Sequence, residues 1–579
     1  MRRTNVIIGS PLPYSGKCGD CMNKRKKIPI GIEDFKTLID RNCYYVDKTL
    51  MIRDILDSGT MVNLFTRPRR FGKSLNMSML RYFFEAGEDH SKLFENLAIM
   101  SEGDEYLSHM GRYPVISLTL KGIECEDFDA SYNALKLLIS SEFNRHIKLL
   151  DDEKLLPHIR NQINSILDNS ADYSLICNSL KLLSDCLFEV TGEKVIVLID
   201  EYDVPLQNAY FHSFYEKMVG LIRLIFSNVL KTNTSLNFAV LSGCLRVSKE
   251  SIFTGLNNLN VNSIRSGSFS TCFGFTANEV RELTEYYGLI DHLDAIKDWY
   301  DGYRFGADEM YNPWSVLMYL NECRTTPETE PESYWSNTSS NSIIQELIEN
   351  SNAETKEEVE TLINGGIIEK PLYEDITYAN IGVNEEYIWS FLLYTGYLKP
   401  IGYYKDGNQT YFKGIIPNRE VAAIYETKFR IWFQSVISKQ KGKLLQYALN
   451  GDTDTMQWEI NQFLLSSISY YDNLESFYHG MLAGLLRGEA RYELKSNREN
   501  GTGRSDIIIK DLLSKKIAIV IEVKIAEHCN ELDTRCDKAL KQIEEEQYAY
   551  DLKQEGYQRI LKYGIAFYKK TCLIKCIEN

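Results

Sequence analysis

Four unbroken runs of apolar, β-rich residues constrain the fold of the first half of the chain. They are Val62–Phe65, Tyr113–Leu120, Lys194–Asp200 and Asn237–Gly243. None shows the apolar–polar alternation of a half-exposed strand, so each is predicted to be a strand covered on both faces. Helical stretches such as Ser131–Ile147 and Phe214–Lys231 lie between the runs. This strand–helix alternation predicts βαβ units around a parallel sheet.

A Gly-Lys-Ser triplet follows the first run. Residues 66–74 read TRPRRFGKS, and the helical pattern SLNMSMLRYFFE continues from Ser74. Strand, loop and helix in this order form the setting of a phosphate-binding loop, where backbone N–H groups and the helix N-terminus surround phosphate. We expect Lys73 to reach the β- and γ-phosphates of ATP and the Ser74 hydroxyl to bind Mg²⁺. The predicted nucleotide-binding residues of the loop are Arg69, Arg70, Gly72, Lys73 and Ser74.

The run Lys194–Asp200 ends in an acidic residue, Asp200, and a second one, Glu201, follows directly. We expect Asp200 to hold the magnesium shell and Glu201 to orient or deprotonate the attacking water. The alternative is a strand that ends in solvated acids. The Gly-Lys-Ser triplet, upstream and in the correct order, favours the nucleotide site.

A polar residue, Ser242, lies near the end of the run Asn237–Gly243. In ATPases of this general type such a residue helps to orient water, so Ser242 is a predicted site residue. Arg246, just beyond it, is a candidate contact for the γ-phosphate or for a neighbouring domain. An ordinary surface arginine is the alternative for Arg246.

Several stretches of the chain together resemble one protein family. They read IPIGIEDFKTLIDRNCYYVDKTLMIRDIL, TRPRRFGKSL, VIVLIDEYDVPL, GCLRVSKESIFTGLNNL, WYDGYRFG and YNPWSVLMYL. They resemble AAA-ATPase-like proteins that carry a C-terminal nuclease-like domain, over nearly the whole chain from about residue 28. The resemblance implies that RPRRFGKS, with Arg67 where such loops usually have their first glycine, is the family's usual form. We expect Arg67 and Pro68 to turn with negative φ, and the arginines at 67, 69 and 70 to add positive charge near the phosphates.

A second group of ionisable residues lies near the C-terminus. Asp506 precedes the apolar run IIIK, while Glu522 and Lys524 lie in IAIVIEVK. Both runs are predicted strands, and alternate residues of a strand share a face, so Glu522 and Lys524 should project together. The residues DLLSKK supply the reversal, and Ser514 lies midway between Asp506 and Glu522. The two carboxylates should therefore face each other across a hairpin, close enough to share one cation, with Lys524 pairing with them when no metal is bound.

This hairpin resembles the core of the PD-(D/E)XK nucleases. The resemblance implies that Asp506 and Glu522 hold Mg²⁺ or Mn²⁺, which activates water, and that Lys524 lies near the attacked phosphate. An ordinary solvated hairpin is the alternative. Glu475, in an expected helix upstream, is a candidate third metal ligand, and Gln542, in the helix downstream, is a candidate catalytic residue; helix-surface polar residues are the alternative for both. His479 has no second histidine at metal spacing, so we interpret it as structural.

The domain organisation that follows is an α/β multidomain protein. We predict a disordered tail over 1–27, a P-loop AAA-like ATPase domain with a parallel sheet over 28–270, a helical lid and winged-helix-like region over 271–465, and an α/β restriction-endonuclease-like domain over 466–579. The middle prediction rests on a helical run, IWSFLLYTGYLKPIGYY, which continues into a small hairpin, QTYFKGIIPN.

Composition limits the function classes. The net charge of −15 argues against coating nucleic acid over the whole surface, although it leaves room for one basic cleft. No run of 18 apolar residues exists, and 13 scattered cysteines suit a reducing compartment, so we expect a cytoplasmic protein without a membrane span. ATP and nucleic acid, DNA rather than RNA, are the expected partners, and a homo-oligomer stays open.

The leading hypothesis is an ATP-hydrolysing protein with a metal-dependent nuclease domain. Two alternatives remain: a nucleotide-regulated module that holds nucleic acid or protein without cutting, and an ATPase that remodels protein partners.

Overall fold

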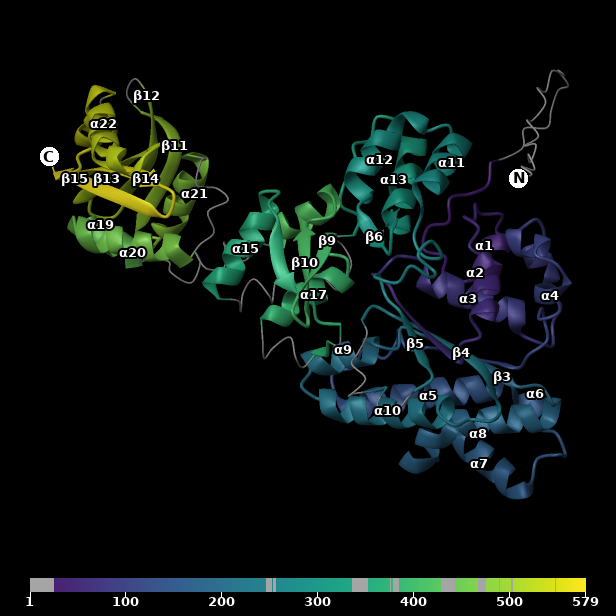
Figure 1. Cartoon of the computed structure of the whole chain (residues 1–579). Helices are drawn as coiled ribbons and strands as arrows, with labels where there is room; N and C mark the ends of the chain where they lie inside the picture. The colour runs from purple at the N-terminus through teal and green to yellow at the C-terminus, as the bar shows by residue number, and fades with distance from the viewer. Residues whose placement is uncertain are drawn as a thin grey trace, which may run out of the picture.

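The computed structural model describes residues 25–245, 252–253, 257–335, 352–374, 376–378, 385–428, 443–466, 475–488, 490–500, 503–546 and 548–578. An N-terminal α/β part, a group of three helices, a small mixed part and a C-terminal α/β part follow one another along the chain and in space (Figure 1). Among the described residues, no helix combines the length and the apolar character needed to cross a membrane. The cysteines of the described part are all free thiols.

The N-terminal part is built on a five-stranded, all-parallel sheet with the order β2-β3-β4-β1-β5. The strands are β1 Val62–Thr66, β2 Val115–Thr119, β3 Val195–Asp200, β4 Leu236–Gly243 and β5 Leu259–Asn262. The four runs predicted as strands are confirmed, and β5 is additional. Every residue of β1 and β3 is buried, as the lack of alternation predicts.

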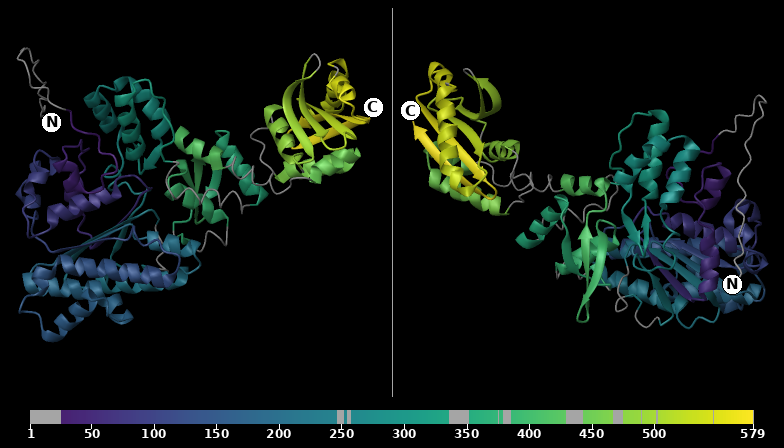
Figure 2. Two further views of the ribbon diagram at one scale, coloured as in Figure 1. Left: turned by 180° about the vertical axis from the view of Figure 1, so that it is seen from behind. Right: turned by 45° about the horizontal axis from the view of Figure 1, so that its top comes forward.

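Helices cover both faces of this sheet, one layer with α1 to α3 and the other with α5, α8 and α10 (Figures 1 and 2). The helices of this part are α1 Phe35–Asp40, α2 Leu50–Ser58, α3 Lys73–Phe84, α4 Asp104–Leu107, α5 Phe128–Arg145, α6 Ile147–Leu150, α7 Pro157–Leu167, α8 Tyr173–Thr191, α9 Val204–Phe211 and α10 Tyr215–Leu230. Parallel strands place their carboxyl ends at one edge, so residues that follow β1, β3 and β4 meet there.

The three-helix group follows the sheet and has its own apolar core. It comprises α11 Ala277–Tyr287, α12 Leu293–Tyr300 and α13 Pro313–Thr325, with the short strands β6 Tyr303–Phe305 and β7 Asp308–Met310. Ile28 belongs to this core, and Lys27 pairs with Cys43. Residues 25–27 of the predicted tail are therefore ordered, while 1–24 lie outside the described residues.

The small mixed part contains the predicted helix and hairpin. Its elements are α15 Ala353–Ile363, β8 Ile368–Pro371, α17 Glu386–Tyr394, β9 Lys399–Asp406 and β10 Gln409–Ile415. The strands form an antiparallel sheet with the order β8-β10-β9. The sequence of a helix running into a hairpin is confirmed.

The C-terminal part holds a five-stranded mixed sheet with the order β11-β12-β13-β14-β15. Its strands are β11 Tyr492–Asn500, β12 Gly503–Asp511, β13 Ile517–Ile525, β14 Arg559–Tyr568 and β15 Thr571–Glu578, and its helices are α19 Lys443–Asn450, α20 Thr453–Ser466, α21 Glu475–Leu485, α22 Leu532–Glu545 and α23 Tyr548–Gln554. Only β13 and β14 pair in parallel. The sequence predicted β12 and β13 but not β11, β14 or β15.

The helices α19 and α20 pack against this C-terminal sheet (Figure 1). The side chains of Asn461 and Gln457 accept the backbone N–H groups of Cys572 and Ile574, which satisfies the exposed edge of β15. The Tyr563 hydroxyl donates to the Ala448 carbonyl. Because of these contacts, we propose that the C-terminal domain begins near residue 443 rather than at 466.

Candidate nucleotide and metal sites

The loop between β1 and α3 positions Lys73 at the start of the helix. Gly72 caps the helix with a left-handed φ of 81°, a conformation that glycine adopts at no steric cost. Lys73 is buried, and its ammonium donates to the carbonyls of Arg67, at 3.1 Å, and Pro68, at 3.0 Å. The Cys244 thiol lies 3.7 Å from the same ammonium. The lysine is thus held over the loop that the sequence predicts to bind phosphate.

The acidic pair lies beside this loop, at the carboxyl end of β3. Asp200 is buried and accepts a hydrogen bond from the Ser242 hydroxyl on the neighbouring strand β4. Burial raises the pKa of Glu201; the charge of Lys73 opposes this rise and that of Asp200 adds to it. Lys73, Asp200, Glu201 and Ser242 are therefore brought together at one edge of the sheet, from three adjacent strands.

A pocket of about 580 Å³ adjoins these residues, which is within the usual range for a nucleotide-sized ligand. The residues from Arg69 to Asn76, including Ser74, line the pocket together with Glu201. Aromatic rings from three segments also line the pocket: Tyr44, Phe275 and Trp314 of α13. The lining of the pocket thus combines the polar groups of the loop with aromatic rings, one of which, Trp314, lies against Arg70.

The three arginines of the loop have different surroundings. Arg69 and Arg70 line the pocket; the Arg69 guanidinium donates to the Gln207 side chain, and that of Arg70 lies 4.4 Å from the centre of the Trp314 ring. Arg67 does not line the pocket. The expectation that Arg67 adds positive charge near the phosphates is therefore wrong.

Arg67 instead points into the interior and is fully buried. Its guanidinium donates to the carbonyls of Thr66, Asn262 and Phe269 and lies about 5 Å from the rings of Phe273 and Phe305. Burial lowers the pKa of Arg67 to about 10. Backbone φ is negative at Arg67 and Pro68, as predicted, and Arg70, like Gly72, is left-handed, with φ of 70°. Arg67 thus ties β1 to β5 and to the segment that leads into the three-helix group.

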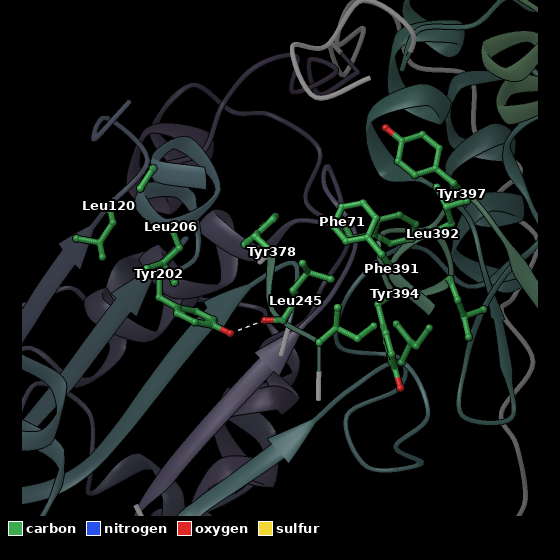
Figure 3. Packing of buried hydrophobic residues seen from close by; sticks show 14 of the residues in the cluster. Phe71, Leu120, Tyr202, Leu206, Leu245, Tyr378, Phe391, Leu392, Tyr394 and Tyr397 are labelled. Atoms are coloured by element: carbon green, nitrogen blue, oxygen red, sulfur yellow. Dashed lines mark hydrogen bonds between the residues drawn. The ribbon is translucent and has the colours of Figure 1, made fainter. Parts of the chain in front are cut away.

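The loop also contacts the parts of the chain that follow the sheet. A Cβ added at Gly396, just after α17, would lie 3.0 Å from the Cβ of Pro68. The Phe71 ring packs edge-on against Tyr303, with ring centres 4.8 Å apart. Tyr378 is buried in the same apolar cluster as Phe71 (Figure 3). Residues of both the three-helix group and the small mixed part therefore contact the loop.

Asp203 is a buried residue of this region that was not predicted from the sequence. Its carboxylate accepts the backbone N–H groups of Cys244, at 2.9 Å, and Leu245, at 3.0 Å, while the neighbouring Tyr202 hydroxyl donates to the Leu245 carbonyl (Figure 3). These contacts fix the chain where it leaves β4. The signal was a second aspartate three residues after Asp200. Arg246 lies outside the described residues.

In the C-terminal sheet, β12 and β13 pair in the predicted register. Ile507 lies opposite Ile521 and Lys510 opposite Ala518, so the reversal is centred on Ser514. Asp506 is the residue next to Ile507, and Glu522 is next to Ile521, so the two acids follow the last pair of this register. Oδ2 of Asp506 accepts the Val523 N–H at 2.8 Å, and the Lys524 ammonium donates to Oε1 of Glu522 at 2.9 Å. The hairpin register centred on Ser514 and the pairing of Lys524 with an acid are confirmed.

Glu522 is buried and has only one nearby cation, Lys524, to balance its charge and that of Asp506 among the described contacts. It is 2% exposed, and its Oε2 has no hydrogen-bond partner in the described part of the chain. Burial, together with the charge of Asp506, raises the pKa of Glu522 to about 7 although Lys524 opposes the rise. A buried carboxylate with an orphaned oxygen, close enough to a second carboxylate to be affected by its charge, fits a hard divalent cation such as Mg²⁺ or Mn²⁺.

The remaining predicted residues lie around this pair. Within the described residues, no group of three or more His, Cys, Asp or Glu side chains forms a metal cluster. Glu475 is the first residue of α21, and its side chain lies outside the described part. Gln542 is half-buried on α22, which packs over β13 and β14. Their roles stay predictions.

Comparisons with known proteins agree with both segments. Residues 29–253 match the family model described as "Predicted AAA-ATPase", and residues 473–576 match that of the PD-(D/E)XK nuclease superfamily. A relative from Azotobacter chroococcum mcd 1, named "Uncharacterized protein in vnfD 5'region", is 26% identical over 543 residues, which cover 92% of this chain and 95% of the relative. Each match spans the segment that holds the corresponding residues: the chain is similar to the predicted AAA-ATPases over residues 29–253 and to the PD-(D/E)XK nuclease superfamily over residues 473–576.

Proposed function

We propose that this protein binds and hydrolyses ATP in its N-terminal domain and cleaves nucleic acid phosphodiesters, in a metal-dependent reaction, in its C-terminal domain. One observation carries the nuclease half: the buried Oε2 of Glu522 lacks a hydrogen-bond partner in the described part of the chain, on an acid that also feels the charge of Asp506. The convergence of Lys73, Asp200 and Glu201 beside one pocket supports the ATPase half.

At the N-terminal site, Lys73 would exchange the loop carbonyls for phosphate oxygens when ATP binds, and loop N–H groups would hold the remaining oxygens. Ser74 and Asp200 are the proposed holders of Mg²⁺, with the Ser242 hydroxyl keeping the Asp200 carboxylate in place. A raised pKa suits Glu201 to accept a proton from the attacking water. Arg69 and Arg70, on the pocket wall, would supply further positive charge.

At the C-terminal site, Asp506 and Glu522 are the proposed metal holders, with Glu475 as a third. A divalent ion bound there would supply an activated water and stabilise the leaving oxygen. Lys524 would then move its hydrogen bond from Glu522 to the phosphate that is attacked. Gln542, on α22, would orient water or substrate. DNA is the proposed substrate.

Calorimetry of ATP binding tests the N-terminal half. Lys73→Ala removes the cation placed on the phosphates and should abolish or greatly weaken binding, while Glu201→Gln should bind ATP normally and hydrolyse it slowly, because an amide cannot accept the proton. Unchanged ATP affinity in Lys73→Ala, or wild-type turnover in Glu201→Gln, would contradict these roles.

Incubation with supercoiled plasmid, single-stranded DNA and RNA, each with Mg²⁺ or Mn²⁺ and with or without ATP, tests the C-terminal half. The wild-type protein should cut at least one substrate only when metal is present. Binding of nucleic acid without any cleavage would favour the module that holds nucleic acid without cutting.

A further inference from the structure

We infer that His479 is a positioning residue of the C-terminal site, which holds the backbone of Asp506 so that its carboxylate lies toward Glu522. The inference deepens the proposed nuclease function and rests on it for the meaning of the site. It concerns the one histidine near the acids, which the sequence alone led us to interpret as structural.

The contact joins a helix to the strand that carries the acid. His479 lies on α21 and is 9% exposed, and its Nε2 lies 2.7 Å from the carbonyl oxygen of Asp506. A carbonyl only accepts hydrogen bonds, so Nε2 must carry the proton. The bond therefore reaches the backbone of the proposed metal holder itself, from a residue 27 positions away.

The backbone at Asp506 is a place where regular strand pairing stops. The register of β12 with β11 passes from Ser505 to Ile507, and the register of β12 with β13 begins at Ile507. The carboxylate of Asp506 accepts a hydrogen bond from the Val523 N–H, and His479 donates one to the Asp506 carbonyl. Two side-chain bonds thus replace a ladder that would otherwise fix the position of the residue.

The helix that presents His479 is itself firmly anchored. The neighbouring Tyr478 hydroxyl donates to the Lys569 carbonyl at 2.9 Å, and the Tyr478 ring stacks on Phe567 with ring centres 4.2 Å apart. Tyr478 is fully buried. His479 is therefore supported by a rigid element, which is what placing an acid to within a fraction of an ångström requires.

Three variants of the full-length protein separate positioning from general support. His479→Phe removes the donor and keeps a ring, while His479→Gln keeps an N–H near the end of the side chain. Tyr478→Phe is the matched control, because it removes one buried helix-to-sheet hydrogen bond that lies away from the acids. The readouts are Mn²⁺ affinity by calorimetry, hydrogen exchange of the Val523 amide, and kcat and KM for cleavage.

His479→Phe should weaken Mn²⁺ binding by about 10- to 100-fold, the usual effect of removing a group that holds a metal ligand. It should also speed exchange at Val523 and lower kcat with little change in KM. His479→Gln should recover most of each loss, and Tyr478→Phe should leave all three near wild type while lowering the melting temperature.

Wild-type Mn²⁺ affinity and wild-type Val523 exchange in His479→Phe would overturn the inference, as would equal losses in Tyr478→Phe. If the wild-type protein binds Mn²⁺ but cuts no substrate, the proposed nuclease function fails, yet Mn²⁺ affinity and Val523 exchange still decide the role of His479. If it does not bind Mn²⁺ either, Val523 exchange alone decides.

Discussion

Arg67 gives a prediction that separates the structural account of the phosphate-binding loop from the sequence-based one. Replacing Arg67 with Met removes the guanidinium and keeps an unbranched side chain of similar length. The carbonyls of Thr66, Asn262 and Phe269 would each lose a donor in a buried site. We expect Arg67→Met to destabilise the N-terminal domain and to leave ATP affinity nearly unchanged, because Arg67 does not line the pocket.

The expected change in the free energy of unfolding combines two destabilising contributions and one stabilising contribution. Each of the three buried acceptors left without a donor costs about 1–3 kcal/mol, and loss of the contacts with the Phe273 and Phe305 rings adds about 1 kcal/mol. Against this, Met relieves the burial of a charge, and a pKa lowered from 12.5 to about 10 corresponds to about 3 kcal/mol. With the middle of these ranges, the net loss is roughly 2–5 kcal/mol.

A thermal melt and ATP calorimetry together check this prediction. A domain of this size should lose about 2–4 °C of melting temperature per kcal/mol, so the Arg67→Met melt should move by about 5–15 °C. Arg70→Met is the matched control, since Arg70 is exposed on the pocket wall beside Trp314; it should lose ATP affinity but little stability. An unchanged melt with a tenfold loss of ATP affinity in Arg67→Met would refute the reasoning.

Three further predictions concern the two sites and the link between them. The pKa of Glu522 in the folded, metal-free protein is about 7, so the folded protein holds this proton more tightly than the unfolded chain does, and the free energy of unfolding falls as pH rises from about 4.5 to 7. Glutamine does not titrate, so the free energy of unfolding of Glu522→Gln should rise relative to wild type by on the order of 3 kcal/mol across that window. A difference between the two proteins that does not change with pH would contradict this prediction. Gly396→Ala adds a methyl group at a φ of 89° and against Pro68, and it should raise the Kd for ATP severalfold. Gly407→Ala is the control: its φ of 56° also strains the backbone, but the space around it is open, so the Kd should not change. Equal Kd values in the two variants would refute a role for the contact with Pro68. If the two domains are coupled, ATP should change nucleic-acid affinity by the same factor as nucleic acid changes ATP affinity, and identical affinities with and without the other ligand would reject coupling.

The sequence predicted elements whose pattern is local. The runs of β1 to β4 lack alternation because both faces of their sheet are covered, and that alone identifies them as buried strands. The hairpin of Asp506 and Glu522 could be predicted in register because a short polar reversal fixes the pairing of both strands at once. The pairing of Lys524 with Glu522 then follows from the two-residue period of a strand.

Features set by distant parts of the chain could not be predicted in this way. Arg67, Arg69 and Arg70 look alike in the sequence, and only the position of β5 and of the segment around Phe269 decides that Arg67 is buried. The packing of α20 on the edge of β15 joins residues more than 100 positions apart, so the domain boundary at 466 had no local signal against it. The role of His479 could not be predicted from the spacing of metal ligands, because its hydrogen bond goes to a backbone carbonyl and not to a metal ion.

The most direct test of the central claim is metal-dependent cleavage by the wild-type protein and by Asp506→Asn, measured on plasmid, single-stranded DNA and RNA. Asparagine keeps the shape of the side chain but removes the charge that acts on Glu522. We predict cleavage by the wild type with Mg²⁺ or Mn²⁺, loss of cleavage in Asp506→Asn, and normal ATP binding in both. Equal cleavage by Asp506→Asn and wild type, or none by the wild type on any substrate, would contradict the claim that this hairpin is a nuclease site.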